Sequence, residues 1–473
     1  MTPTNLRAPR PLPGGPMTAA RPRRPVSRAR RSGALAPALL VLLAVYVFGL
    51  AFSMQHLSYD VWGAVALAPV LVMISVPLLI RATRRHGDPG MVRLIVLALV
   101  LKLVGALARY AVAFGVYGGS ADAASYHEAG KVLAPLYRSG NLSAEITGPG
   151  SLGTRTIKGV TGFVYAIIGP SQLAGFLFFS WLGFWGLYLF YRAFVLAVPQ
   201  GDARRYALSV FLLPSMLFWP SSIGKEAIIT LTLGVTAYGA ARLLTRRRGG
   251  LVILALGVAG TALIRSHVAL AVFVAVSVGY IFRRSLGVSP FAPVAKAIGL
   301  AVLATISVVV LSQVKDELRF ESFDVKSVQQ QLATNQRNTT DGGSQFETTS
   351  DGSFASIPGS LITILFRPWP FEANNLQNVI AALEGTVLAV LFFRSRRRLL
   401  AIPRQIRGHP YVIMVLVYTV LFAFAFSTFS NFGIVARQRV QLFPFVLVLL
   451  ALPAAGQRRA PAPSPATPRR LSV

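Results

Sequence analysis

Residues Val61–Ile80 read VWGAVALAPVLVMISVPLLI and contain no ionisable side chain. A helix of about 20 apolar residues is long enough to cross the roughly 30 Å hydrocarbon core of a bilayer. Three further blocks have the same character, at Leu35–Phe52, Phe176–Tyr191 and Tyr411–Phe426. Because backbone N–H and C=O groups find no water in lipid, they must pair with each other within a helix. These blocks therefore predict an all-α polytopic membrane protein.

The composition of the whole chain agrees with this prediction. Of 473 residues, 54% are hydrophobic and only 13% are charged, whereas soluble domains carry about 25% charged residues. We expect a disordered basic arm at 1–33, a transmembrane domain at 34–456 and a disordered tail at 457–473. About twelve membrane helices are expected, near 34–54, 61–80, 91–117, 171–195, 205–220, 224–244, 250–264, 267–282, 295–313, 376–393, 411–428 and 435–454.

Positive charge is concentrated in short runs beside the apolar blocks. The runs are Arg23-Arg24, Arg84-Arg85, Arg246–Arg248, Arg283-Arg284 and Arg396–Arg398. Lys and Arg are enriched in the cytoplasmic loops of membrane proteins. With a cytoplasmic N-terminus every one of these runs falls inside, and most of the 16 acidic residues fall outside. The pattern predicts a multi-pass plasma-membrane protein with both termini in the cytoplasm.

This orientation gives two long extracytoplasmic loops, at about 118–158 and 314–360. Short apolar stretches at 160–169 and 359–366 follow them. These stretches are too short to span and predict re-entrant helices, which need protein or a cavity around them. Amphipathic helices lying on the membrane surface are the alternative.

Charge and cysteine content exclude several classes of site. The net charge of +31 invites a nucleic-acid interpretation, but the Arg runs adjoin apolar blocks and form no separate basic domain. The chain has no cysteine, which excludes disulfides, thiolate nucleophiles and cysteine-ligated metals. No cofactor is required by the remaining residues, and a divalent metal is compatible with them but not indicated.

Carboxylates on the predicted outer side are candidates for a general base. Asp122 lies in the segment SADAASYHE at 120–128, and in a helix it would share a face with Tyr126. We expect Asp122 to accept a proton from a sugar hydroxyl, with Glu226 and Glu372 as alternatives. Tyr126 and His127 are expected to contact substrate. A solvated acid or a helix cap is the other interpretation of Asp122.

Cations at outer helix ends are candidates for binding a phosphate. They run against the positive-inside trend, and charges near membrane depth are functional candidates. Arg binds phosphate through a planar fork. The expected substrate-binding residues here are Lys225, Arg265, His267, Arg367, Arg437 and Arg439, and Trp369 is expected to stack on a sugar face or the prenyl chain. Anchoring at the lipid–water interface is the alternative for each of them.

Four short segments together resemble GT-C-type membrane glycosyltransferases and the related exopolysaccharide and O-antigen polymerases. They are Asp122–Tyr126, Pro214–Glu226, Phe366–Glu372 and Asn431–Arg439, the last followed by Pro444. The resemblance implies transfer from a polyprenyl-phosphate sugar, with an acidic outer-loop residue as the base, here Asp122. The acidic loop of the usual GT-C pattern follows the first helix, whereas Asp122 follows the third. The twelve-helix plan is more similar to O-antigen ligases and polymerases, which use Arg at the phosphate.

The expected function is glycosyl transfer or polysaccharide polymerisation at the outer membrane face. The expected partners are membrane lipid, a polyprenyl-(pyro)phosphate-linked sugar and a saccharide acceptor, without nucleic acid. The alternative from another class is a transporter or flippase of a lipid-linked saccharide, which should show repeated halves and broken helices. A non-catalytic scaffold of a surface assembly complex is a third alternative.

Overall fold

The apolar blocks form helices. The structure is a computed structural model that describes residues 32–84, 88–119, 122–143, 150–283 and 353–454, with six single positions between 297 and 346. Within these residues the regular structure is entirely helical, and the one β-bridge, between Gln345 and Asn431, is isolated. The prediction of an all-α chain is confirmed for this part. Helix α1 (Ser32–His56) forms a unit by itself, and the following helices belong to a second unit.

Five helices in the described part are long and apolar enough to cross a membrane. They are α2 (Tyr59–Arg84), α3 (Pro89–Ala111) with its π-helical continuation η2 (Val112–Val116), α6 (Gln172–Ala197), α9 (Lys225–Leu244) and α15 (Leu376–Arg394). Shorter apolar helices are α10 (Gly250–Ile264), α11 (Ser266–Ile281), α14 (Ile357–Phe366) and α18 (Pro410–Ala425). The expected number of twelve spans stays a prediction.

Two segments expected as single helices are broken. The first, 205–220, is divided into α7 (Ala203–Leu212) and α8 (Pro214–Phe218). Proline has no N–H and its ring clashes with the preceding turn, so the helix stops before Pro214. The second, 435–454, is divided into α19 (Phe432–Gln438), η5 (Arg439–Gln441) and α20 (Phe443–Leu450), with a bend of 66°. Pro444 lies in the first turn of α20.

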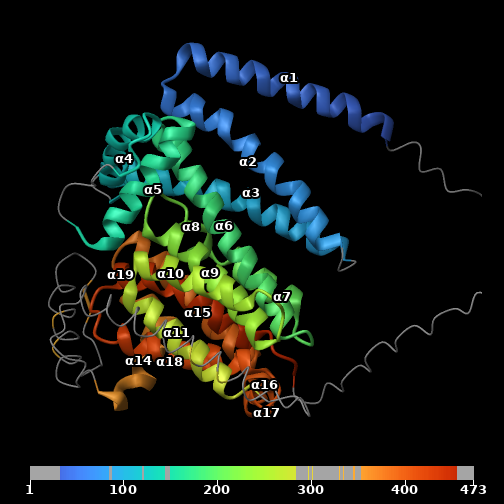
Figure 1. The fold of residues 1–473 in the computed structure, drawn as a ribbon, viewed down its shortest axis with the longest axis vertical. Coiled ribbons are helices and arrows are strands. Elements are labelled where there is room, and N and C mark those ends of the chain that lie inside the picture. Colours follow the sequence, from blue (N-terminus) through green and yellow to red (C-terminus); the bar gives the residue numbers. More distant parts are fainter. Residues whose placement is uncertain are drawn as a thin grey trace, which may run out of the picture. The chain divides into compact units, whose positions relative to one another are not determined.

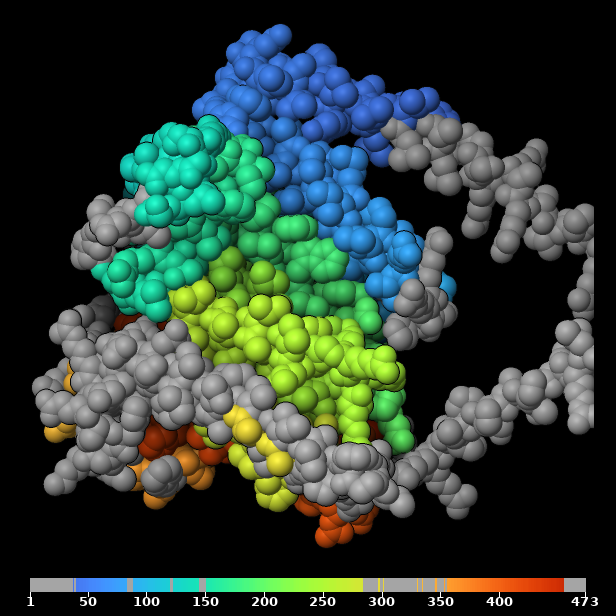
Figure 2. Space-filling view, viewed as in Figure 1, coloured from blue at the N-terminus to red at the C-terminus, as the bar shows by residue number. Residues whose placement is uncertain are grey.

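The segment expected as the first outer loop contains helices. Helix α4 (Asp122–Arg138) packs against α5 (Leu152–Ile168), which is longer than the short apolar stretch predicted there. Gly153 of α5 lies so close to α10 that a Cβ atom would stand 2.2 Å from the Ile264 carbonyl oxygen. Figure 2 shows the α4–α5 pair, in teal, directly beside the yellow-green surface of α9 and α10.

Four further short helices lie in the described part of the chain. They are η3 (Phe354–Ser356), η4 (Pro370–Glu372), α16 (Arg396–Leu399) and α17 (Ile402–Ile406). Most of the expected helix at 295–313 and of the 314–360 loop, nearly all of the 1–33 arm and the whole 457–473 tail lie outside the described residues.

Helices α6 and α9 form the centre of the second unit and run side by side in Figure 1. Glycines permit their close approach. A Cβ atom on Gly234 would stand 2.3 Å from the Gly186 carbonyl oxygen, and one on Gly186 would stand 2.4 Å from the Thr230 carbonyl oxygen. Small residues of this kind are what brings helix backbones together in membranes. This packing supports the first turn of α9, where the polar site begins.

We expect Gly234→Ala to lower the free energy of unfolding by about 1–3 kcal/mol, since overpacking forces the two backbones apart. Gly115→Ala is the matched control, because a Cβ atom there meets nothing within 4 Å. Equilibrium unfolding in mixed micelles measures both variants. Equal stability of the two would contradict the close α6–α9 contact.

Candidate functional site

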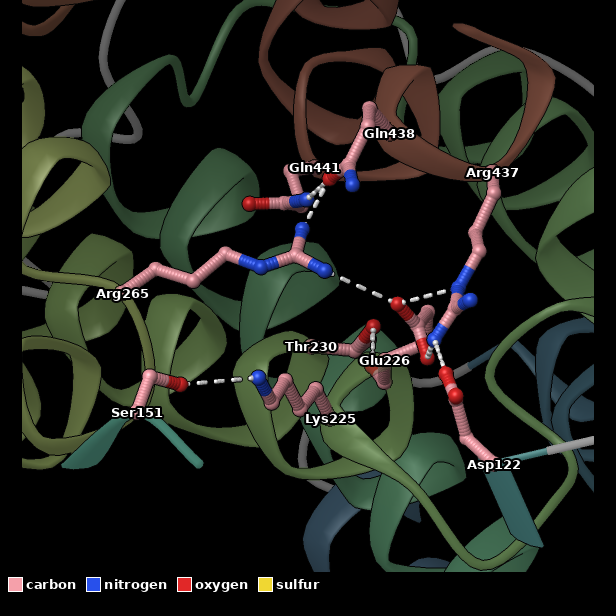
Figure 3. A network of polar contacts seen from close by, with 9 residues as sticks. All are labelled: Asp122, Ser151, Lys225, Glu226, Thr230, Arg265, Arg437, Gln438 and Gln441. Carbon is pink, nitrogen blue, oxygen red and sulfur yellow. Dashed lines mark hydrogen bonds and ion pairs between the residues drawn. The ribbon is translucent and has the colours of Figure 1, made fainter. Parts of the chain in front are cut away.

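The carboxylate of Glu226 is the centre of a network of charged side chains. Glu226 lies in the first turn of α9 and is only 3% exposed. Its Oε1 accepts from Arg265 Nη2 at 3.0 Å and from Arg437 Nε at 2.7 Å, and its Oε2 accepts from Arg437 Nη2 at 3.0 Å (Figure 3). A buried carboxylate is costly unless it is paired and hydrogen-bonded. Both oxygens of Glu226 meet these requirements.

Arg437 extends the network to Asp122. Its Nη2 also lies 3.0 Å from Asp122 Oδ2, so one guanidinium group contacts two carboxylates. The Asp122 side chain, at the start of α4, is 61% exposed, whereas that of Glu226 is 4% exposed. The two acids thus differ in their access to a ligand. Figure 3 shows the Arg437 side chain extending from α19 to a position between the Glu226 and Asp122 carboxylates.

Arg265 closes the other side of the network. It links α10 to α11 in an extended conformation and donates to Gln438 Oε1, which also accepts from Gln441 Nε2. Burial lowers the pKa of Arg265, and the Glu226 carboxylate opposes this shift. The Lys225 side chain points away from Glu226, and its Nζ donates to Ser151 Oγ at 3.3 Å (Figure 3). Ser151 is the residue directly before α5.

Tyr126 and His127 occupy different sides of α4. Tyr126, one turn after Asp122, is buried; burial and then the nearby Asp122 and Glu226 charges raise its pKa to about 12. His127 is also buried, and its Nδ1 lies 2.7 Å from the hydroxyl of Tyr165 on α5. Burial lowers the pKa of His127. The predicted substrate residue His127 therefore packs within the α4–α5 pair.

Arg367, Trp369 and Glu372 form a second polar group. Arg367 Nε lies 3.0 Å from Glu372 Oε1, and Glu372 Oε2 accepts from the backbone N–H of Trp369 at 2.8 Å. Burial would raise the pKa of Glu372, but these hydrogen bonds outweigh it and hold the pKa below its usual value. The Arg367 guanidinium also lies over the rings of Phe346 and Phe432, at 4.6 and 5.4 Å.

Arg439 belongs to a third, fully buried group. Its Nη2 lies 3.8 Å from Glu384 Oε1, and its Nη1 donates to the Arg367 carbonyl at 3.1 Å. Glu384 Oε2 accepts from the N–H and hydroxyl of Ser215. Arg437 and Arg439, predicted to act together, therefore point into different surroundings. His267 lies near Phe426, with a distance of 5.9 Å between ring centroids.

One cavity is lined by residues of the Glu226 network, and a second cavity shares two lining residues with the first. A polar cavity of about 190 Å³ is lined by Asp122, Glu226 and Arg437, among others. A mainly apolar cavity of about 280 Å³ is lined by residues of α3, η2, α8 and α15. Arg109 and Trp219 line both cavities, so the two spaces meet at these side chains. Of the twelve predicted site residues, Asp122, Glu226 and Arg437 line one of these two cavities.

Arg109 was not among the predicted site residues. It lies within the third apolar block, on α3, and its charge within such a block was the available signal. Its guanidinium carbon lies 4.9 Å from the ring centroids of both Phe218 and Trp219. In the described part of the chain, no three His, Asp or Glu side chains gather into a group that could hold a metal ion.

No protein-family model, curated protein or solved structure matches this chain.

We expect Glu226→Gln to lower the free energy of unfolding by about 3–5 kcal/mol, because it leaves two guanidinium groups without their buried counter-charge. Glu128→Gln is the control: Glu128 is 66% exposed and pairs with Lys131 at the surface, so its loss should cost under about 0.5 kcal/mol. Unfolding curves of the two variants give the comparison. A Glu226→Gln protein as stable as the control would exclude the anchoring role.

Low pH should weaken the contact between His127 and Tyr165. Because the pKa of folded His127 lies below the ordinary value of 6.5, the unfolded chain binds a proton more readily as pH falls below about 6.5. Stability from neutral His127 is thus full above that pH and is lost below it. The melting temperatures of the wild type and His127→Gln should converge between pH 7.5 and 5.5. A constant difference would argue against a buried, neutral His127.

Proposed function

We propose that this chain transfers glycosyl groups, or polymerises polysaccharide, at the outer face of the plasma membrane from a polyprenyl-(pyro)phosphate-linked sugar. The supporting observation is one pair of adjoining cavities. The polar one holds an exposed carboxylate, Asp122, beside the Arg437 guanidinium, and the apolar one meets it at Arg109. A lipid-linked sugar has the same order of parts: a polar sugar, an anionic phosphate and an apolar chain.

Asp122 is assigned as the general base. In the transfer step the acceptor hydroxyl oxygen forms a bond to the anomeric carbon of the donor sugar, and the bond from that carbon to the phosphate oxygen breaks. The hydroxyl proton passes to Asp122, and the bonding electron pair leaves with the phosphate, whose charge guanidinium groups stabilise. Glu226 is less suited to this role, because it is buried and accepts three hydrogen bonds from two Arg residues.

The membrane arrangement proposed with this function has about twelve spans, with the site outside and both termini in the cytoplasm. The ends of α9 support it. The helix has 20 residues, which corresponds to about 30 Å. It begins at Lys225 and Glu226, and Arg246–Arg248 follow its other end. The acidic site and the Arg-rich turn are thus separated by about one bilayer core.

Transport of a lipid-linked saccharide is the second candidate. The 66° break between α19 and α20 and the buried Glu384–Arg439 pair favour it, since broken helices and intramembrane charges are features of transporters. Purified protein in detergent encloses no compartment, so transport cannot occur there but transfer of a labelled sugar can. Transfer under these conditions would therefore favour the first candidate, and its absence would favour the second.

We expect Asp122→Asn to reduce kcat for transfer from a polyprenyl-phosphate sugar by about 10²–10⁴-fold with a nearly unchanged KM for the donor. Asn still accepts a hydrogen bond from Arg437 but cannot take a proton. Glu128→Gln, on the same helix, is the control. Full activity of Asp122→Asn would show that Asp122 has only a structural role, as the first residue of helix α4.

Single cysteines test the proposed orientation, because the chain has none of its own. An impermeant thiol reagent applied to intact cells should label Ser143→Cys but not Ser32→Cys, while both react after permeabilisation. The parent chain provides the unlabelled control. Labelling of the Ser32 position alone would invert the proposed sidedness of the site.

A further inference from the structure

The short helix α8 contains a backbone carbonyl that cannot form its helical hydrogen bond. In an α-helix the carbonyl of residue i accepts from the N–H of residue i+4. For Met216 that residue is Pro220, which has no N–H. Met216 is fully buried, and a buried carbonyl without a partner is costly, above all in a membrane protein. Another donor is therefore required at this position.

Lys102 supplies this donor. Its Nζ donates to the Met216 carbonyl at 2.6 Å. Lys102 lies on α3, inside an apolar block, and its exposed fraction is zero. It forms no ion pair with any residue that the structure describes. Ionisable side chains within membrane helices are costly and are functional candidates. Here Lys102 replaces the N–H that Pro220 lacks.

Lys102 belongs to a stripe of α3 that faces α8. Lys102, Gly105 and Arg109 share one side of the helix, because residues three and four apart are neighbours on a helix surface. A Cβ atom on Gly105 would stand 2.3 Å from the Leu217 carbonyl oxygen, so the two backbones are in close contact. The guanidinium carbon of Arg109 lies 4.9 Å from the ring centroid of Trp219. The stripe thus contacts the α8 segment at three successive points.

The position of α8 determines part of both cavities. Ser215, near its start, donates to Glu384 from its N–H and its hydroxyl, and these two residues line the apolar cavity. Trp219, directly after its end, lines both cavities together with Arg109. Lys102 is not among the lining residues of either cavity. A shift of α8 would therefore change the boundary between the cavities, although Lys102 itself does not reach them.

We propose that Lys102 is a positioning residue of the candidate site: by donating to the Met216 carbonyl it fixes α8, and α8 in turn holds Trp219 beside Arg109. The specific element is the pair of Lys102 and Pro220, since the proline removes a donor and a lysine on another helix supplies it. The effect of Lys102 on glycosyl transfer rests on the proposed function, whereas its effect on α8 does not.

Fluorine NMR of the full chain in detergent micelles tests the position of α8 without any substrate. The five Trp residues are replaced by 5-fluorotryptophan, and the Trp219 line is identified as the one absent from Trp219→Phe. Lys102→Met keeps an unbranched side chain of similar length but has no donor, so the Trp219 line should shift. The Trp62 line, from the start of α2, should stay in place. An unmoved Trp219 line in Lys102→Met would overturn the proposal.

A second substitution tests whether the hydrogen bond itself is responsible. Pro220→Ala restores the missing N–H, which can then bind the Met216 carbonyl as in an ordinary helix. The double variant Lys102→Met/Pro220→Ala should therefore return the Trp219 line toward its wild-type position. If Lys102→Met alone fails to fold, the double variant should fold. A role of Lys102 in packing alone predicts no such rescue, so a double variant that stays shifted or unfolded would refute the assignment.

A glycine variant displaces α8 from the same stripe while leaving Lys102 in place. The new Cβ atom of Gly105→Ala would meet the Leu217 carbonyl, whereas that of Gly115→Ala would meet nothing within 4 Å. The Trp219 line should shift in the first variant and stay in place in the second. Equal spectra of the two variants would contradict the close contact between α3 and α8, and the proposal with it.

Transfer kinetics test the consequence for the site. A misplacement of about 1 Å can cost on the order of 10²-fold in rate, so the kcat of Lys102→Met should fall by about 10–10²-fold and recover in the double variant. Full activity of Lys102→Met with a shifted Trp219 line would refute the positioning role. Absence of transfer in every protein, wild type included, would instead remove the proposed function and leave the NMR result on α8 intact.

Discussion

The ion pairs of the Glu226 carboxylate with Arg265 and Arg437 hold together the charged network at the start of α9. The three side chains come from the start of α9, the turn between α10 and α11, and α19. Each would be costly to bury alone, whereas together they satisfy one another. Arg437 then reaches Asp122 on α4. Four segments far apart in the sequence are thereby joined in one network, and the exposed acid stands next to the buried one.

The apolar blocks predicted the helical class because lipid leaves the backbone no other partner. The sequence also predicted Asp122, Glu226, Arg265 and Arg437 as site residues, since charged groups at outer helix ends are unusual. It did not predict their partners. Arg437 and Arg439 are two residues apart, yet the 3-10 turn η5 directs Arg439 into a buried contact with Glu384. Such directions depend on tertiary packing, which periodicity does not encode.

The breaks in two expected helices were likewise not predicted from hydropathy. Hydropathy treats 205–220 and 435–454 as continuous, but Pro214 interrupts the first and the second bends by 66°. The first break has a consequence for the site: α8 carries Ser215, which binds Glu384, and Phe218, which lies beside Arg109. Arg109 was not predicted as a site residue because the third apolar block, 91–117, contains no acidic residue that could pair with it. Its aromatic neighbours lie more than a hundred residues away, and only the fold brings them to it.

A double-mutant cycle between Glu226 and Arg437 tests the organising role of this contact most directly. Glu226→Gln, Arg437→Gln and the double variant are compared by equilibrium unfolding in mixed micelles. If the buried contact holds the site together, the double variant should be more stable than the sum of the single effects by about 1–3 kcal/mol. Effects that add within about 0.5 kcal/mol would contradict a network built on Glu226.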